Sequence, residues 1–363
     1  MAFTAKDVQA LREKTNVGMM DCKKALVEAD GDMDKAVEIL REKGLASAAK
    51  KASRVAAEGV IGVYTDGKAS ALVELNCETD FVGNNPEFKA LANQIAKTAV
   101  EAKPADVEAL VATTISGGSI SVADAVQELF LKVRENLKLR RFALVEGTAV
   151  SYIHAGGSVG VLVNFETDAD YNDEFVAMGK NVAMQVAAMS PEYLSKEDIS
   201  ADNLAKMKSI IVDSSLNKPD SLPKPILKEL CEKACTEKLW SAEDIAAYDE
   251  QKNNKFLFNF LSKEAVATLA ELAVAGKDQY IENKIFAGAV EGRLGKQIKE
   301  ICLLEQPFVR TDLFEGSVNG YVASVAKALG KSIKVAGFVR FAKGEGIEKK
   351  VDDFAAEVAS MMK

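Results

Sequence analysis

The sequence has few of the residues from which metal sites and acid-base catalytic sites are usually built. It contains one histidine, His154, which excludes sites that need several histidines. Its five cysteines are an odd number and lie scattered, as is typical of reduced thiols in a cytosolic chain. No stretch approaches the roughly 18 to 20 apolar residues that cross a bilayer, and the first residues lack the apolar core of a signal peptide. We therefore expect a cytoplasmic protein without a membrane partner.

A phosphate-binding loop is missing as well. Gly330-Lys331-Ser332 matches the end of such a loop, but the glycine required five residues earlier is Val325, and a strand is predicted where a helix is needed. The chain has 46 Lys and Arg against 54 Asp and Glu, and its net charge of -8 is not typical of a nucleic-acid-binding protein. We expect no bound nucleotide, no cofactor and no nucleic acid, and favour a protein or small molecule as the partner.

What the chain does contain is enough apolar material for two or three domains. Its 363 residues are 48% hydrophobic and 28% charged, which is ordinary for a globular protein. Residues 1–55 show three short helical patterns, with Thr4 capping the first, a tight turn at residues 18–21 before the second, and residues 30–32 starting the third. A small, basic linker follows. This arrangement resembles a three-helix domain of the ubiquitin-associated type.

Two copies of one pattern come next. Each copy has two strands joined by a tight turn and then a helix with a single apolar stripe. Asn76-Cys77-Glu78-Thr79-Asp80 in the first copy aligns with Asn164-Phe165-Glu166-Thr167-Asp168 in the second, at an offset of 88 residues. Phe81 in the first copy corresponds to Ala169 in the second. Equivalent scaffolds with one specialised loop indicate that the function lies at that loop.

We predict an α+β fold with antiparallel sheets and five parts. Residues 1–55 are the ubiquitin-associated-like helical domain and its linker, 56–145 the first repeat, and 146–199 with 300–343 the second repeat. Between the repeats we expect helices at 105–111 and 122–137 and a strand at 140–146. Residues 200–299 are predicted to be an enlarged helical insertion. Residues 344–363 form a C-terminal module whose amphipathic helix carries Val351, Phe354, Ala355, Val358 and Met361.

The loop of the first copy carries the bulky aromatic residue Phe81. It lies between an alternating strand and a helix that Asn85 caps and Pro86 opens. A tip supported by a strand and a helix can present an anchor residue to a partner. Alternatively, the ring folds back under the loop and joins the core. The sequence leaves both alternatives open.

Other residues with chemical potential have simpler explanations. Four carboxylates recur in the two loops: Glu78, Asp80, Glu166 and Asp168. They are interpreted as turn-forming residues, since no histidine or metal motif accompanies them. His154 lies in a predicted strand, where a packed or interface role is favoured over catalysis. Cys231 and Cys235, four residues apart on a predicted helix, are interpreted as buried thiols.

Six ordered segments carry a resemblance to a known family. They lie at residues 11–15 with 18–26, then at 76–82, 136–141, 306–309, 344–349 and 353–358. Together they resemble bacterial elongation factor Ts, the guanine-nucleotide exchange factor of elongation factor Tu. The resemblance covers the chain except residues 200–299, a region longer than the dimerisation hairpin usual in that family.

The resemblance implies a function without bond chemistry. Family members bind elongation factor Tu in its GDP-bound and nucleotide-free forms. They insert an Asp-Phe pair near the magnesium and phosphate site of the partner, here Asp80 and Phe81 flanked by Thr79 and Val82. Further partner contacts are implied at Arg12, Met19, Met20, Lys23, Val133, Arg134, Val309 and the last helix, and at His154 toward another partner domain. Arg134 stands where the family often has a glycine.

Two other classes of function stay open at this stage. One is an adaptor of the ubiquitin-associated type that has no exchange activity and whose sheets merely display helices. The other is an acid-base enzyme that uses the repeated carboxylates. The insertion at 200–299 is compatible with homodimerisation, an enlarged partner contact or a separate module, because helical stripes alone do not distinguish these roles.

Overall fold

The computed structural model describes residues 3–15 and 17–348. The described residues up to Ser190 and from Phe308 onward belong to one compact unit, and Pro191–Pro307 form another. The expected C-terminal amphipathic helix, with Val351, Phe354, Ala355, Val358 and Met361, lies outside the described residues.

The first unit begins with α1 (Ala5–Thr15), α2 (Met19–Glu28) and α3 (Met33–Lys51), as the periodicity predicts. Asp32 caps α3 by accepting hydrogen bonds from two amides of its first turn. The prediction of a turn at residues 18–21 is wrong in part, because only Gly18 precedes α2 and Met19 already belongs to it. Met19 and Met20 therefore stand on a helix, which gives their side chains a defined direction.

These three helices share their core with α7 (Val122–Val133). The buried apolar residues of this core include Leu11, Leu26, Leu40, Phe130 and Leu131. The helix predicted at 122–137 ends four residues early, because Arg134 adopts a left-handed backbone with φ of 60°. The N-terminal helices are thus packed onto the element that precedes residues 134–136.

Two antiparallel three-stranded sheets follow, each with its strands in sequence order. The first contains β1 (Glu58–Thr65), β2 (Ala69–Cys77) and β3 (Lys138–Glu146), and the second contains β4 (Thr148–His154), β5 (Val159–Thr167) and β6 (Ile333–Ala342). Asp66 closes the predicted hairpin between β1 and β2 by accepting hydrogen bonds from the next turn amides. Ile61 and Leu72 pack against Leu162 and Phe341 between the sheets. The predicted α+β class is confirmed.

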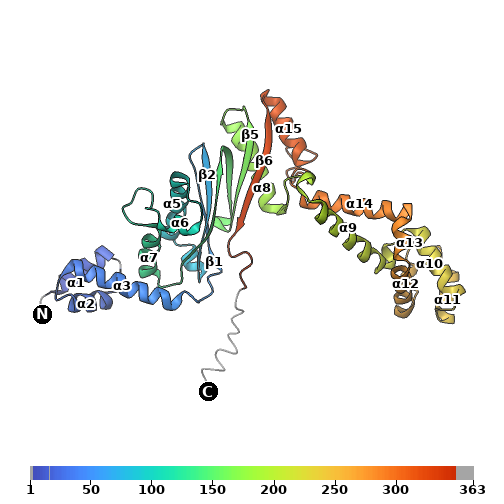
Figure 1. The fold of residues 1–363 in the computed structure, drawn as a ribbon, viewed down its shortest axis with the longest axis horizontal. Helices are drawn as coiled ribbons and strands as arrows, with labels where there is room; N and C mark the ends of the chain where they lie inside the picture. Colours follow the sequence, from blue (N-terminus) through green and yellow to red (C-terminus); the bar gives the residue numbers. More distant parts are fainter. Residues whose placement is uncertain (1–2, 16, 349–363) are drawn as a thin grey trace, which may run out of the picture. The chain divides into compact units, whose positions relative to one another are not determined.

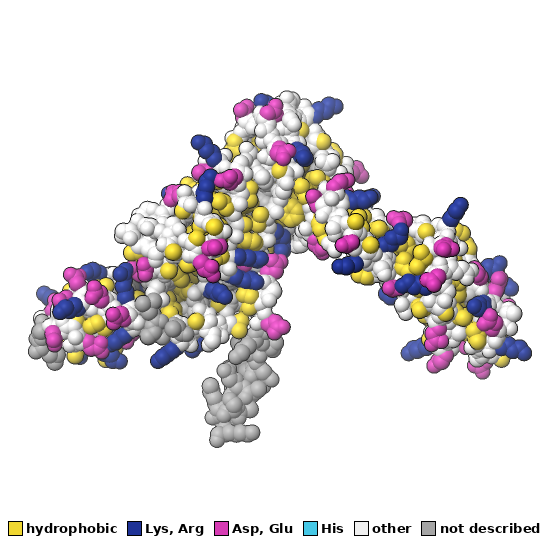
Figure 2. All heavy atoms as spheres, viewed as in Figure 1, with side chains coloured by type: hydrophobic (Ala, Val, Ile, Leu, Met, Phe, Trp, Pro, Cys, Tyr) yellow, Lys and Arg dark blue, Asp and Glu magenta, His cyan; other side chains and the backbone are white. Residues whose placement is uncertain are grey.

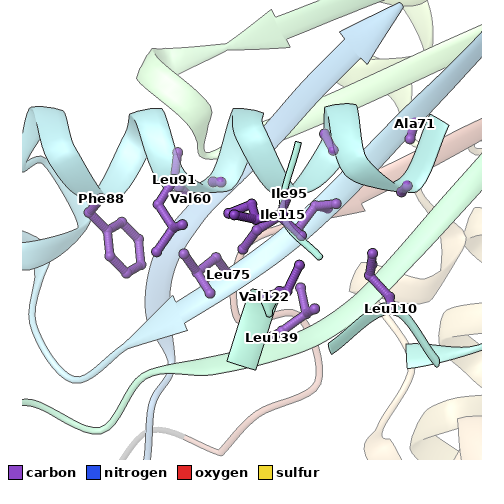
Figure 3. Close-up of a cluster of buried hydrophobic side chains, with 14 of the residues drawn as sticks. Val60, Ala71, Leu75, Phe88, Leu91, Ile95, Leu110, Ile115, Val122 and Leu139 are labelled. Carbon is purple, nitrogen blue, oxygen red and sulfur yellow. The ribbon is translucent and has the colours of Figure 1, made fainter. Parts of the chain in front are cut away.

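A long helix covers the outer face of each sheet: α5 (Pro86–Ala102) on the first and α8 (Asp173–Met189) on the second (Figure 1). Figure 3 shows Phe88, Leu91 and Ile95 of α5 directed onto the strands, where they meet Val60 and Leu75. Alternation along the strands makes this two-sided packing possible, since successive side chains point to opposite faces. The helices α6 (Val107–Ala112) and α15 (Val318–Leu329) also belong to the first unit.

The duplication predicted from the sequence reappears in the packing of strand against helix. In the first copy, Gly62 of β1 lies under Ala92 of α5, so closely that a Cβ atom on Gly62 would come within 2.5 Å of the Ala92 backbone. In the second copy the large and small partners are exchanged. Val150 occupies the strand position and Gly179 of α8 the helix position, where an added Cβ would lie 2.5 Å from the valine. Each copy thus reaches the same close helix-to-strand approach with a different residue pair.

The second unit is helical, as predicted for residues 200–299. It contains α9 (Ala201–Leu216), α10 (Lys224–Thr236), α11 (Ala242–Gln251), α12 (Lys263–Ala275), α13 (Lys277–Glu282) and α14 (Lys284–Ile301). Trp240, Tyr248, Leu269 and Phe286 lie in its own core, and the indole N–H of Trp240 donates to the carbonyl oxygen of Ala265 at 3.0 Å. None of the helices within residues 3–15 and 17–348 has the length and apolar character needed to span a bilayer.

Candidate partner-binding surface

The loop after β2 is a short helix rather than an open turn. The chain forms α4 (Asp80–Gly83), and the Thr79 hydroxyl caps it by accepting a hydrogen bond from the Val82 amide. Asn85 then caps α5 and Pro86 opens it, as predicted. The sequence missed α4 because four residues are too few to show helical periodicity.

Phe81 points outward from this helix, with 86% of its surface exposed. Asp80 beside it is exposed, whereas Val82 and Gly83 are buried against the core. A Cβ on Gly83 would lie 3.1 Å from the carbonyl oxygen of Gly59, so α4 packs closely on β1. The alternative in which the ring folds back under the loop is therefore wrong. The equivalent region of the second copy has no such ring.

The second loop instead ties its aromatic residue back to the protein. The Tyr171 hydroxyl donates to the carbonyl oxygen of Ala149 at 3.3 Å, and its ring lies 5.9 Å from the ring of Phe175. Ala169, which aligns with Phe81, offers only a methyl group. Tyr171 is 49% exposed, against 86% for Phe81, so the aromatic residue of the first loop is the more exposed of the two.

The amide, the hydroxyl and the carbonyl oxygen of Thr79 all form hydrogen bonds. Its amide and hydroxyl both donate to the Glu135 carboxylate, at 2.9 and 2.6 Å, and its carbonyl oxygen accepts from the Cys77 thiol at 3.1 Å. Burial, together with the nearby Glu135 carboxylate, raises the pKa of Cys77 to about 12, so the thiol stays protonated and able to donate. The residue directly before Asp80 and Phe81 is thus fixed from three directions.

Residues 134–136 also connect this loop to the N-terminal helices. The Asn136 amide donates to the Glu78 carboxylate at 2.7 Å, and the Asn136 side chain donates to the carbonyl oxygen of Arg54 at 2.8 Å. The Arg134 guanidinium forms an ion pair with Asp21 of α2 at 2.9 Å. The loop and the first turn of α2 are therefore attached to one short segment.

The remaining residues expected to bind a partner lie in different places on the first unit. Arg12, Met20 and Lys23 are exposed on α1 and α2, with Met20 at 66% exposure, and Met19 is exposed as well. Val133 is half-buried and packs against the core between α5 and the first sheet, and Arg134 forms the ion pair with Asp21 described above. Val309 is exposed, and its amide donates to the Gln185 side chain at 2.9 Å.

His154 lies at the exposed end of β4, with Nδ1 3.0 Å from the Tyr152 hydroxyl. A packed role is therefore wrong. The turn after it approaches the first copy, because a Cβ on Gly156 would lie 3.7 Å from Nζ of Lys89, which donates to Asn84 at 3.2 Å. The fold thus brings the turn after His154 near the loop of Phe81, which the sequence did not indicate.

Three of the four loop carboxylates have separate partners, and the fourth, Asp80, is exposed. Glu78 accepts hydrogen bonds from Asn136 and Arg54, Glu166 pairs with Lys334, and Asp168 accepts from the amide of Ser332. Within the described part of the chain, no group of three or more His, Cys, Asp or Glu residues is arranged to hold a metal ion. Cys231 is buried, and burial raises its pKa to about 12, but Cys235 is only half-buried, so the prediction of two buried thiols is wrong for Cys235.

Sequence reasoning missed one buried charge near this surface. Glu74 of β2 is fully buried and accepts hydrogen bonds from Arg140, Arg141 and the amide of Gly344. Burial alone would raise the pKa of Glu74, but the bonds from Gly344, Asn76 and Arg141 outweigh it and lower the pKa. A glutamate inside a mostly apolar strand was the available signal. The Glu74 carboxylate anchors the turn at residues 343–346 to the first sheet.

Comparisons with known proteins agree with the resemblance in the sequence. The family model described as Elongation factor TS matches residues 78–345. The chain is 38% identical over 367 residues to Elongation factor Ts of Syntrophotalea carbinolica, covering all of both chains. It is 40% identical over 366 residues to that of Clostridium acetobutylicum, covering 99% of this chain and 98% of the relative. For Clostridioides difficile the identity is 38% over 365 residues, covering 99% of each.

Proposed function

The chain belongs to the elongation factor Ts family, and from that premise we propose that it binds elongation factor Tu carrying GDP and promotes GDP release. Asp80 and Phe81 enter the partner near its magnesium and phosphate site. The chain then stabilises the nucleotide-free form until GTP binds. The single observation that carries this proposal is the exposed ring of Phe81 on a capped helical turn whose base is fixed by hydrogen bonds.

This mechanism requires differential binding and no bond chemistry. If the chain binds nucleotide-free elongation factor Tu more tightly than the GDP-bound form, it must weaken GDP binding by the same factor, because coupling between two ligands is reciprocal. Burying one phenylalanine contributes about 2 to 3 kcal/mol. Exchange accelerated by several orders of magnitude therefore needs additional contacts.

The exposed residues of the first unit supply those contacts in this proposal. Arg12, Met19, Met20 and Lys23 form one group on α1 and α2, attached to the Phe81 loop through residues 134–136. Val133 and Arg134 lie on that connecting segment, with Thr79 and Val82 flanking the inserted pair. Val309 and the segment beyond residue 344 contribute further, and His154 faces a second domain of the partner.

The setting we propose is the cytoplasm, without a nucleic acid or membrane partner. The visible face in Figure 2 carries positive and negative side chains interspersed, with no large area of one sign. A surface of mixed charge, on a chain whose net charge is -8, is not typical of a protein that binds the phosphate backbone of a nucleic acid. This supports a protein as the partner.

The role of the helical unit is a separate question. It has its own core, yet Ile210, Phe256 and Phe260 are exposed on it. Homodimerisation, a larger contact with elongation factor Tu and a separate module are the three roles we consider. The mass in solution, measured alone and with elongation factor Tu, distinguishes them.

The test of the proposed function is the release of labelled GDP from purified elongation factor Tu, measured with and without this chain. We expect strong acceleration by the wild type. Unchanged release together with binding of another protein would favour the adaptor of the ubiquitin-associated type. Turnover of a small substrate that Asp80→Asn abolishes would favour an enzyme instead.

A further inference from the structure

One carboxylate accepts three of the hydrogen bonds that hold the Phe81 loop. Glu135 accepts hydrogen bonds from the Glu78 amide at 3.1 Å, the Thr79 amide at 2.9 Å and the Thr79 hydroxyl at 2.6 Å. Both of its oxygens are used, and all three donors belong to the two residues before Asp80. Bonds to an ionised acceptor are stronger and more directional than neutral ones. Glu135 therefore determines where α4 begins.

The hydroxyl that Glu135 binds is also the cap of α4. The Thr79 hydroxyl donates to Glu135 and accepts from the Val82 amide, so its rotamer is set by two partners at once. Rotation of Thr79 would break both bonds and release the first turn of α4. The orientation of Phe81, two residues along the chain, depends on this arrangement.

The neighbours of Glu135 extend the same restraint to the N-terminal helices. Arg134 pairs with Asp21, which lies directly after Met20 on α2, and the carbonyl oxygen of Arg134 accepts from Lys51 at the end of α3. Residues 134–136 thus restrain two groups of exposed apolar side chains, namely Phe81 in the loop and Met19 with Met20 on α2.

We propose that Glu135 is a positioning residue for nucleotide exchange: it holds Phe81 in its outward orientation before the partner arrives. The inference rests on the proposed function, because the benefit of a fixed ring is a smaller loss of conformational freedom on binding elongation factor Tu. This role requires no contact between Glu135 and the nucleotide. Glu135 acts through Thr79 and α4.

The first arm of the experiment needs no partner. Hydrogen exchange is followed by mass spectrometry on the free, full-length chain, comparing wild type with Glu135→Ala and Glu135→Gln. We expect the amides of residues 78–82 to exchange at least about tenfold faster in Glu135→Ala, with α5 and β2 unchanged. Glu135→Gln keeps the shape and one acceptor oxygen, so its effect is intermediate. Glu101→Ala, which removes an exposed carboxylate on α5, serves as the matched control and leaves the loop unchanged.

The second arm is a double-mutant cycle with Phe81→Ala, read as affinity for nucleotide-free elongation factor Tu. We expect Glu135→Ala to lower the affinity about tenfold on its own and to add nothing in the Phe81→Ala background. If Glu135→Ala does not fold, Glu135→Gln takes its place in both arms. Unchanged amide exchange at residues 78–82, or losses that add fully in the double variant, would overturn the proposal. If the wild type does not promote GDP release, the proposed function fails, while the first arm still decides whether Glu135 fixes the loop.

Discussion

Replacing Phe81 with alanine separates folding from partner binding. The ring is 86% exposed in the free chain, so its removal leaves no cavity and breaks no hydrogen bond of the loop. We expect the free energy of unfolding to change by no more than about 0.5 kcal/mol, as for other exposed positions. Nearly all of the area of the ring is still available to be buried in a complex.

The size of the binding effect follows from that available area. Transfer of a phenylalanine side chain out of water contributes about 2 to 3 kcal/mol, which corresponds to a factor of about 25 to 150 in affinity. GDP release from elongation factor Tu, measured by stopped flow at subsaturating concentrations of the variant, should therefore slow at least about tenfold.

Two controls make the assay decisive. Asn84→Ala changes an exposed side chain of the same loop and should exchange GDP at nearly the wild-type rate. Thermal unfolding of Phe81→Ala should match that of the wild type. A variant that keeps the wild-type rate, or one that loses activity only because it unfolds, would refute the reasoning from the exposed ring.

Further predictions concern the scaffold beneath this surface. The pKa of Glu74 is lower in the folded chain than its usual value of 4.5, so the ionised carboxylate stabilises the fold at pH values above 4.5. This stabilisation is lost as the pH falls through the pKa of the folded state. Glu74→Gln should therefore be less stable at pH 7 but show a flatter dependence on pH below about 5, in denaturant titrations; equal slopes would contradict this. Gly62→Ala should destabilise the first unit by about 1 to 3 kcal/mol, because its Cβ would meet the Ala92 backbone. Its matched control is Gly288→Ala on α14, where the Cβ meets open space and helix propensity should raise stability by up to about 1 kcal/mol; equal effects of the two would rule out the close approach as the cause.

Much of the fold is predictable from local signals in the sequence. The stripe of Phe88, Leu91 and Ile95, with Asn85 and Pro86 before it, defines α5 because periodicity and capping agree. The Asp66-Gly67 hairpin and the aligned repeats define the paired sheets. These features depend on neighbours in the chain, which a sequence displays directly.

The candidate site was only partly predictable, because its support comes from distant residues. The Glu135 carboxylate binds Thr79 from 56 positions away, and no local pattern indicates that pairing. The exposure of Phe81 follows from the burial of Val82 and Gly83, which depends on the packing of α4 against β1. A single turn of helix and a left-handed Arg134 likewise leave no periodic signal.

The most direct test of the central claim is the affinity of the chain for elongation factor Tu in its GDP-bound and nucleotide-free forms, measured at equilibrium for wild type and Phe81→Ala. The account predicts that the wild type prefers the nucleotide-free form and that Phe81→Ala reduces this preference by at least about tenfold. If the substitution weakens binding to both forms equally, Phe81 is only a contact residue and does not couple binding to GDP release.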